Sequence, residues 1–257
     1  MSEMQAAAQA RNPHVSRARM ASDPSQEPFD SRTRQRPHHV AGTADEYNNE
    51  FHIAVASDPV RRGGASSLLQ RRYAWRGYSV TPLQHHAGAE RVTLSACMEE
   101  TTIATITASV DAEEGLYVGR LYPEAVAALR AEGRKLCEFT KLAVDDSVRS
   151  QTVLGAIFHV ACIYVIDLHA CTDVLIEVNP RHVRFYERML GFTRAADERL
   201  DPEVNAPAVL MQLDLRHCAK EIDRLGGLRG DAKERSFYPF FFARHEAAEI
   251  TRRLRAH

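Results

Sequence analysis

The chain has 257 residues, of which 44% are hydrophobic and 26% are charged. This composition allows a real core in one large or two small domains, and it excludes a fully disordered, a collagen-like or a disulfide-stapled chain. The 33 basic residues nearly balance the 34 acidic ones, so the net charge of -1 gives no whole-molecule attraction to nucleic acid or to an anionic membrane. Five cysteines without a Cys-x-x-Cys pair argue against a disulfide framework or a zinc site and fit a reducing cytoplasm.

Residues 1–45 are rich in Ala, Arg, Ser, Pro and Gln and show no periodic apolar pattern. They cannot bury enough surface to offset the entropy of ordering, so we predict a disordered N-terminal tail. The first ten residues lack the apolar region of a secretory signal, and acidic residues argue against a transit peptide. The most apolar run, Val153–Leu168, is shorter than the ~20 residues that span a bilayer. We predict a buried helix there, with His159 as a core histidine.

Order is expected from about residue 46, and five elements are predicted before the middle of the chain. They are a strand over Phe51–Ala56, a helix from Pro59 to about residue 75, a hairpin of strands Arg91–Met98 and Thr101–Val110, and a helix over Pro123–Arg134. Asp58 precedes the first helix as its N-cap, and Pro59 suits the first helical position. Glu99-Glu100 is the tight connection of the hairpin.

The centre of the chain alternates strands with helices. The predicted elements are strand Lys135–Val144, a long helix with apolar pairs every four residues from Val153 to Ile166, strand Val174–Asn179, helix Arg181–Leu190 and strand Val209–Leu215. This order predicts an α/β sheet with at least one parallel pair. Gly191 is expected to end its helix in the left-handed conformation. Two further helices, Cys218–Leu225 and Ala243–Leu254, flank the aromatic run Phe237–Phe242.

The segment Glu177–Phe192 carries the first functional motif: Asn179 at the start of a helix, Phe185-Tyr186 within it and Gly-Phe at its end. It resembles the strand-to-helix motif of the GNAT acyltransferase superfamily, in which a wedge between two parallel strands holds the pantetheine arm of a thioester donor. The resemblance implies that Asn179 contacts this arm and that Tyr186 protonates the leaving thiolate, chemistry that suits a phenol. The alternatives are that Tyr186 only packs on the sheet and that Asn179 is only a helix N-cap.

A second motif, Glu138-Phe-Thr-Lys-Leu-Ala-Val144, resembles the Glu-x-x-Arg/Lys strand of acyl-homoserine-lactone synthases and of FeeM-like long-chain N-acyl amino acid synthases. The stretch from Gly115 to Leu136 also looks FeeM-like, so the resemblance covers roughly residues 50–215. Glu138 can bind the ammonium of an acceptor amine and take its proton. Lys141 can bind the carboxylate of an amino acid acceptor or a donor carbonyl.

Residues three apart on a straight strand face opposite ways, so Glu138 and Lys141 share a site only if a bulge intervenes. The alternative is that both form ion pairs at the sheet edge. Glu177, on the neighbouring strand, is a second candidate base. Backbone amides beside residues 138–144 would hold the oxyanion. The expected substrate contacts are Thr140, Lys141, Leu142, Val144, Glu177 and Asn179.

The loop before the long helix lacks the glycines that hold the diphosphate of CoA, because its one glycine, Gly155, comes late. We therefore expect a donor on acyl carrier protein, an acidic partner. Arginines near the expected cleft mouth are candidates to bind it, or else form a solvated helix face. They are Arg149, Arg181, Arg184 and Arg188.

The sequence thus predicts a mixed α/β, GNAT-like acyltransferase domain (46–215) between the tail (1–45) and a C-terminal helical extension (216–257) packed on it. The expected reaction moves a long-chain acyl group from an acyl-thioester to the amine of an amino acid, without a metal or redox cofactor. Alternatives are an acyl-homoserine-lactone synthase, disfavoured by the single tryptophan, a CoA-dependent small-amine N-acetyltransferase, and a non-catalytic GNAT-fold module that binds a lipid or signal.

The acceptor amine, the acyl length and the oligomeric state stay open. We expect a cytoplasmic protein with acyl carrier protein and an amino acid as partners and without nucleic acid. It could associate with membranes through its lipid product. The aromatic run and the basic C-terminal helix could also contact a membrane surface, but docking on the sheet by aromatic anchors is the favoured interpretation.

Overall fold

The computed structural model describes residues 51–256 except 75–81, 84–87, 149 and 230–233. Contacts divide the chain into Met1–Ala41 and Gly42–His257, and every described residue belongs to the second unit. The predicted tail and Arg149 lie outside the described residues.

The described elements alternate between strands and helices in chain order. They are β1 Phe51–Val55, α1 Pro59–Ala74, β2 Arg91–Met98, β3 Thr101–Val110, η2 Tyr117–Arg120, α2 Pro123–Ala131, β4 Leu136–Val144, α3 Gln151–Ile163, η3 Tyr164–Leu168, β5 Asp173–Val178, η4 Pro180–His182, α4 Val183–Leu190, β6 Thr193–Arg194, β7 Arg199–Asp201, β8 Ala206–Asp214, α5 Leu215–Leu225, η6 Tyr238–Phe240 and α6 Arg244–Arg255.

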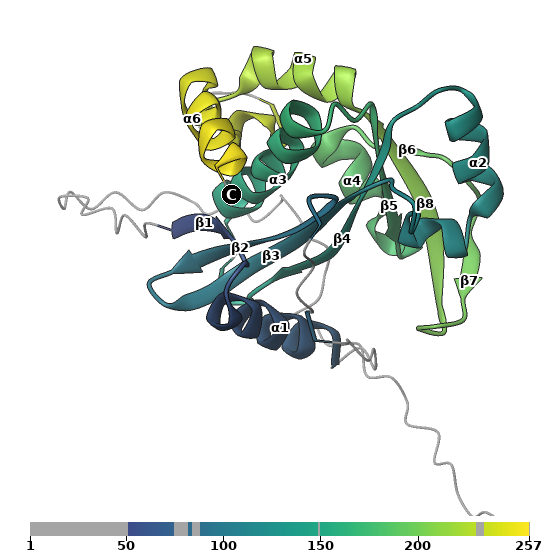
Figure 1. The fold of residues 1–257 in the computed structure, drawn as a ribbon, viewed down its shortest axis with the longest axis horizontal. Coiled ribbons are helices and arrows are strands. Elements are labelled where there is room, and N and C mark those ends of the chain that lie inside the picture. Colours follow the sequence, from purple (N-terminus) through teal and green to yellow (C-terminus); the bar gives the residue numbers. More distant parts are fainter. Residues whose placement is uncertain (1–50, 75–81, 84–87, 149, 230–233, 257) are drawn as a thin grey trace, which may run out of the picture. The chain divides into compact units, whose positions relative to one another are not determined.

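The strands form one mixed sheet in the order β1-β2-β3-β4-β5-β8-β6, with β7 paired to β8 off this path (Figure 1). Neighbours from β1 to β4 are antiparallel, β4 and β5 are parallel, and β5 and β8 are antiparallel. The predicted α/β class and its parallel pair are therefore confirmed. The hairpin is confirmed too, and Glu99 in its turn has a φ of 51°.

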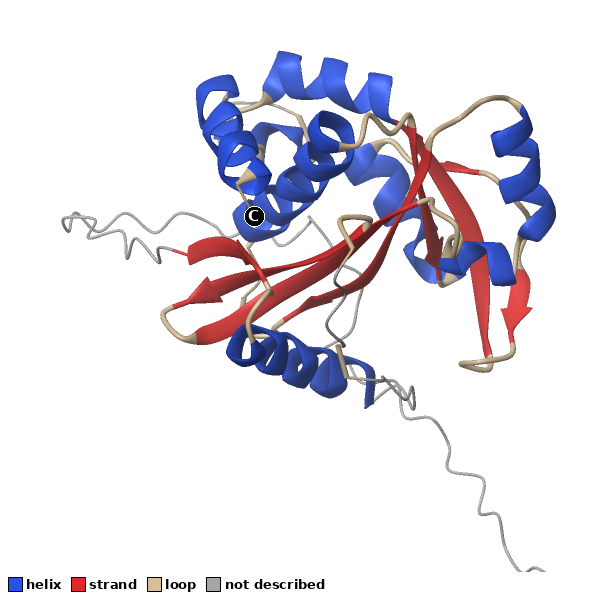
Figure 2. Ribbon diagram, in the orientation of Figure 1, coloured by secondary structure: helices blue, strands red, loops and turns tan. Residues whose placement is uncertain are grey.

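Helices cover both faces of the sheet (Figure 2). One face carries α3 to α6 over a large apolar cluster that includes Phe139, Ile176 and Val209. The other face carries α1 over β3 and β4. Farther along the same face, η2 and α2 pack on a smaller cluster that includes Leu136 and Leu175. Side chains alternate along a strand, so the faces separate Phe139 from Leu136 and Ile176 from Leu175.

Helix α3 is the central element of the first face. Ser150 caps it by accepting the Val153 N–H at 3.4 Å, and ten of its residues are buried. The segment Gln151–Leu168 is long and apolar enough to cross a membrane, but 67% of it is buried in the protein, as expected for a core helix. A turn of π-helix, Tyr164–Leu168, ends it.

The C-terminal aromatic run, Phe237–Phe242, packs over the helices of this face. Phe237, Tyr238 and Phe241 are buried, and the Tyr238 hydroxyl donates to the Leu190 carbonyl at 2.6 Å. The Phe242 N–H donates to Nδ1 of His159 at 2.8 Å, and burial lowers the pKa of His159 to about 4. His159 is thus the satisfied core histidine that the sequence predicts. Among the anchors, Phe237 contacts Phe158 of α3 and Phe185 of α4, and all three pack in or against the apolar cluster that also contains the side chains of this sheet face.

The structure corrects several predicted boundaries. Helix α2 ends at Ala131 instead of Arg134, because Gly133 adopts a φ of 75° that a helix cannot continue. The chain after Asn179 begins as a 3-10 turn, and only Val183–Leu190 is α-helical, ending at Gly191 as predicted. The short elements η2, β6 and β7 were not predicted, since they are too short to show a period.

Candidate active site

Strand β4 contains the bulge that a shared site of Glu138 and Lys141 requires. Between two paired positions, β3 advances from Thr105 to Thr107 while β4 advances from Thr140 to Ala143, so β4 holds one extra residue. Lys141 lies in this bulge with a φ of 53°. The extra residue changes the alternation of side chains, and it re-aims the side chains that follow it.

The parallel pair opens beside this bulge. Strands β4 and β5 pair only over Leu136–Glu138 and Asp173–Leu175, although both strands continue. Among the described residues, the edge of β4 that faces β5 has no strand partner beyond Glu138. The two strands therefore diverge into a wedge, which we call the β4–β5 wedge. Its β4 side includes the predicted contacts Leu142 and Val144, both half-buried.

Glu138 is buried at the closed end of the wedge, with 1% of its surface exposed. Its Oε2 accepts the Val118 N–H at 3.0 Å, which ties β4 to η2. Burial raises the pKa of Glu138, and the N–H groups of Tyr117 and Val118 oppose this shift. Burial and the charge of Arg91 lower the pKa of Lys141, while the charge of Glu138 raises it. Glu138 is thus hydrogen-bonded within the fold and does not line the pocket described next.

Glu177 projects from β5 on the same face as Leu175. Its Oε2 is buried and has no hydrogen-bond partner among the described residues. Burial, followed by the charges of Asp201, Glu138 and Glu203, raises the pKa of Glu177 to about 7. A carboxyl group with this pKa can exchange a proton near neutral pH.

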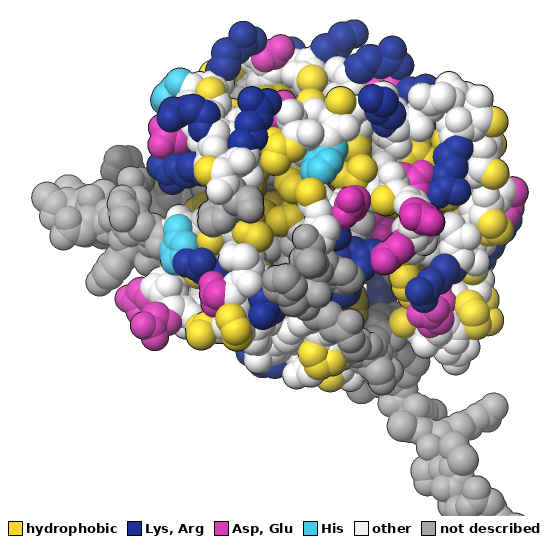
Figure 3. Space-filling view, viewed as in Figure 1, with side chains coloured by type: hydrophobic (Ala, Val, Ile, Leu, Met, Phe, Trp, Pro, Cys, Tyr) yellow, Lys and Arg dark blue, Asp and Glu magenta, His cyan; other side chains and the backbone are white. Residues whose placement is uncertain are grey.

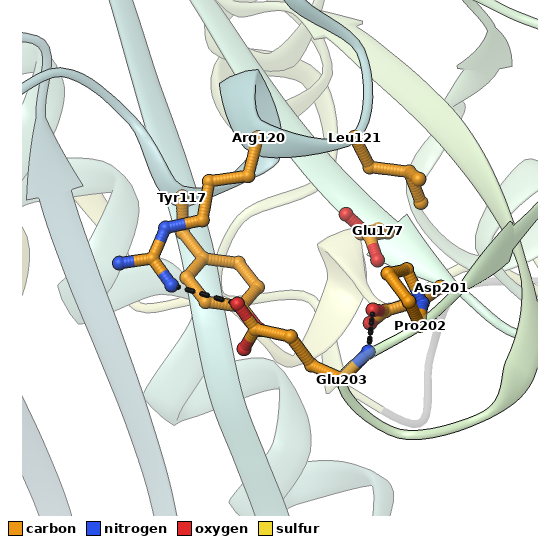
Figure 4. A pocket seen from close by; sticks show the side chains of 7 residues that line it. All are labelled: Tyr117, Arg120, Leu121, Glu177, Asp201, Pro202 and Glu203. Carbon is orange, nitrogen blue, oxygen red and sulfur yellow. Dashed lines mark hydrogen bonds and ion pairs between the residues drawn. The ribbon is translucent and has the colours of Figure 1, made fainter.

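Glu177 forms one wall of a pocket of about 90 Å³, which we call the Glu177 pocket (Figure 4). Its lining is Tyr117, Arg120, Leu121, Glu177, Asp201, Pro202 and Glu203. The Glu203 carboxylate accepts from the Tyr117 hydroxyl at 2.7 Å and from Arg120 at 2.9 Å. The Arg120 guanidinium also lies over the Tyr117 ring, 4.8 Å from its centre.

These pocket residues come from two segments that are far apart in sequence. Tyr117 and Arg120 belong to η2, whereas Asp201 ends β7 and Glu203 lies in the turn to β8. The Asp201 side chain accepts the Glu203 N–H at 2.8 Å and so shapes this turn. Apart from Glu177, sequence analysis missed the charged residues here. The segment Tyr117–Arg120 lies within the stretch that looks FeeM-like, but no pattern in the sequence around it indicates that it lies beside Asp201.

Tyr186 lies on α4 and packs against the apolar cluster of the α3 face. Its ring meets Phe185 and Phe192 edge-on at centroid distances of 5.3 Å and 5.8 Å. Tyr186 and the two carboxylates Glu138 and Glu177 thus belong to opposite faces of the sheet. The wedge is the opening between the strands that separate them.

Asn179 caps the turn after β5. Its Oδ1 accepts the Arg181 N–H at 3.3 Å, and its Nδ2 donates to the Pro207 carbonyl at 3.3 Å. The N-cap interpretation therefore has a structural basis. Thr140 is half-buried and precedes the bulge, on the same face as Glu138.

Three of the four predicted carrier-binding arginines are described. Arg181, Arg184 and Arg188 are exposed, and none forms an ion pair within the described part of the chain. Figure 3 shows a further group of Lys and Arg side chains along the edge over α5 and α6. Several of those are paired, as Arg224 is with Glu221 and Arg244 with Asp223.

The start of α3 has a packing role for its glycine. A Cβ on Gly155 would lie 2.7 Å from Cβ of Phe240, so only glycine allows the aromatic run to approach this closely. The packing of α3 against the aromatic run therefore explains the glycine at position 155 without a phosphate-binding role. Within the described ranges, no three His, Cys, Asp or Glu side chains are grouped to hold a metal ion.

Together, these features define a class of protein. A mixed sheet that opens between two parallel neighbours, with a bulge on one strand and an ionisable carboxylate on the other, is the framework of a GNAT acyltransferase. A sequence model described as "N-acyl amino acid synthase FeeM" matches residues 64–214, more than half of the chain. The chain therefore belongs to the FeeM family of N-acyl amino acid synthases and is an N-acyltransferase.

The chain is also similar to several solved structures. FeeM, an N-acyl amino acid synthase from uncultured soil microbes, is 26% identical over 66% of this chain and 93% of its own, with a TM-score of 0.60. The acyl-homoserine lactone synthase BjaI is 12% identical over 68% and 88%, with a TM-score of 0.49. ElaA of Escherichia coli is 9% identical over 64% and 99%, with a TM-score of 0.48. No curated protein matches the chain.

Proposed function

We propose that the chain transfers a long-chain acyl group from acyl carrier protein to the amine of an amino acid, with Glu177 as the base. The observation that carries this proposal is the ionisable carboxylate of Glu177, which lies on β5 beyond its pairing with β4, lines a pocket, and keeps its buried Oε2 without a partner among the described residues. The acyl thioester would lie in the wedge, and the amino acid would enter from the Glu177 pocket.

In this mechanism the acceptor ammonium first gives a proton to Glu177. The neutral amine then attacks the thioester carbon, and backbone N–H groups on the free edge of β4 are the available donors to the oxyanion. Collapse breaks the C–S bond, the amide nitrogen releases its second proton, and the leaving sulfur takes up a proton. The proposed donor of that proton is Tyr186, which would reach the sulfur from the α3 face.

For Glu138 we propose a supporting role. Its Oε2 is engaged by the Val118 N–H, so we assign it to holding η2 against β4 and to raising the pKa of Glu177 by its charge. Lys141 in the bulge lies at the wedge and is a candidate to bind the donor carbonyl. No metal or redox group takes part in this proposal, because the phosphopantetheine arm arrives with the donor.

The test is reconstitution with the purified full-length chain. Palmitoyl-acyl carrier protein and palmitoyl-CoA are offered separately with a mixture of the 20 amino acids, and products are identified by mass spectrometry. N-palmitoyl amino acids with a faster rate from the carrier are the expected result. Absence of any N-acyl amino acid with both donors would contradict the proposal, and an equal or faster rate from CoA would remove the carrier from it.

The carrier is supported by Arg181, Arg184 and Arg188, which are exposed and unpaired in the described chain. Acidic carrier surfaces favour such basic faces through steering and ion pairing. Charge reversal of all three should raise KM for the palmitoyl-carrier by roughly 10-fold or more and leave KM for palmitoyl-CoA nearly unchanged. The matched control reverses Arg216, Arg244 and Arg252 of the extension. Equal KM changes in both sets would argue against a local docking site.

We further propose that the protein acts in the cytoplasm and that contact with membranes follows from its N-acyl product. The basic side chains over α5 and α6 leave a peripheral contact with an anionic surface open (Figure 3). Flotation with vesicles of phosphatidylglycerol, with and without product, tests this contact. Equal partition in both samples and with neutral vesicles would count against it.

A further inference from the structure

The Glu177 pocket is unbalanced in charge. Three carboxylates line it, Glu177, Asp201 and Glu203, against the single cation Arg120. Arg120 is already paired with Glu203, whose second oxygen accepts from Tyr117. In the described part of the chain, neither of the other two carboxylates has a Lys or Arg within ion-pair distance.

Both of these carboxylates are shielded from water, Asp201 more than Glu177. Asp201 has 7% of its surface exposed, accepts the Glu203 N–H, and lies within hydrogen-bond reach of the Glu177 carboxyl group. The other Glu177 oxygen, Oε2, is buried and receives no donor from the described residues. A buried carboxylate oxygen without a partner costs free energy that a charged donor would recover. The cavity in front of these oxygens is open to receive one (Figure 4).

A neutral amino acid does not correct this imbalance. It brings one ammonium and one carboxylate, so the pocket keeps its excess negative charge after binding. The ammonium must also lose its proton before it attacks, which removes the only cation supplied to the site. An acceptor with an additional positive group would keep a cation beside Asp201 after the attacking amine becomes neutral.

We propose that the acceptor is a basic amino acid and that Asp201 is the residue that selects for its second cationic group. This inference rests on the proposed acyl transfer and names the class of acceptor. The attacking amine faces Glu177 and the wedge. Arg120 uses one guanidinium nitrogen, Nη1, to bond Glu203, and its side chain is 67% exposed, so its other N–H groups are the donors proposed for the α-carboxylate. Selection then comes from charge, because the remaining lining is Leu121, Pro202 and Tyr117, whose hydroxyl is already bonded to Glu203.

The test compares lysine with norleucine, which has a similar chain and lacks the terminal ammonium. With one palmitoyl donor, we expect kcat/KM for lysine to exceed that for norleucine about 10-fold or more, the range of one charge-assisted contact. Asp201→Asn should bring the ratio close to one. Asparagine can still accept the Glu203 N–H, so the turn is expected to persist, and circular dichroism and the melting temperature verify this.

The matched control is Asp197→Asn, an exposed aspartate without an ion pair that lies outside the pocket lining. It should leave the ratio unchanged. Faster acylation of norleucine than of lysine by the parent chain, or an unchanged ratio in Asp201→Asn, would overturn the inference while acyl transfer itself stands. Titration calorimetry without a donor gives a second readout: lysine that binds no tighter than norleucine overturns the inference even if no acylation is seen.

Discussion

The two faces of the sheet differ in whether their buried polar groups are hydrogen-bonded. On the α3 face, His159 accepts the Phe242 N–H and Tyr238 donates to the Leu190 carbonyl. On the other face, Glu177 keeps a buried oxygen to which no described residue donates, next to the carboxylate of Asp201. The polar groups of the first face are thus satisfied within the fold, whereas the second face keeps an unsatisfied carboxylate oxygen at the pocket that we propose for the acceptor.

The largest expected effect concerns the face with the Glu177 pocket. Replacing Glu177 with Gln removes the proton acceptor and keeps the shape, so kcat/KM for N-acylation should fall about 10²- to 10⁴-fold. The melting temperature at pH 8 should stay the same or rise, because an uncompensated charge is removed. Initial rates and thermal unfolding measure both. A variant that keeps more than half of the parent's activity would contradict the assignment of the base.

The α3 face should respond in stability instead. Phe241→Ala removes a buried ring that stacks on His159 at 4.8 Å and packs near Tyr238 at 5.1 Å. We expect a loss of about 3–5 kcal/mol in the free energy of unfolding, measured by urea denaturation. A control at an exposed site, Leu200→Ala on β7, should cost little. A Phe241 variant as stable as this control would show that the aromatic run does not seal the core.

The pH profile distinguishes the faces by titration. Since the pKa of Glu177 is raised to about 7 and the base is active when deprotonated, kcat/KM should fall about 10-fold per pH unit below 7. His159, with a pKa lowered to about 4, should not contribute in this range. Rates from pH 5.5 to 9 with one donor test this. A profile flat down to pH 5.5 would mean that Glu177 is not the base.

The smallest effect is expected at the boundary between the faces. Asn179→Ala removes the N-cap of the turn after β5 and should cost about 1 kcal/mol in the free energy of unfolding. If Asn179 also contacts the donor arm, KM for the acyl donor rises as well. Unfolding and donor titration are compared with Asn179→Asp, which keeps the cap. A stability loss with unchanged KM for the donor would show that Asn179 acts only as an N-cap and does not contact the donor arm.

The sequence predicted the fold well where local patterns are strong. Strands Arg91–Met98 and Thr101–Val110 match the structure at both ends, because alternation and a two-residue turn fix them locally. The parallel pair and the Gly191 helix end follow from the same kind of signal. A bulge is the condition for a site shared by Glu138 and Lys141, and the register of β3 and β4 shows this bulge.

The candidate site was predicted only in part. Glu177 was named as the second base, but its environment depends on Asp201 and Glu203, which tertiary contacts bring to it. The hydrogen bond from Tyr117 to Glu203 joins residues 86 positions apart, and no local period reports such a contact. Likewise, the Val118 N–H that engages Glu138 belongs to a four-residue turn without a sequence signature.

The close approach at Gly155 has a consequence for how the chain is made. Helix α3 begins the longest apolar helical segment, and the aromatic run that covers one side of it follows much later in the sequence. During synthesis α3 leaves the ribosome well before Phe237–Phe242 exists to cover it, so its uncovered side is exposed to chaperones or to other nascent chains in the meantime. The core around α3 is therefore completed only after the aromatic run has been translated.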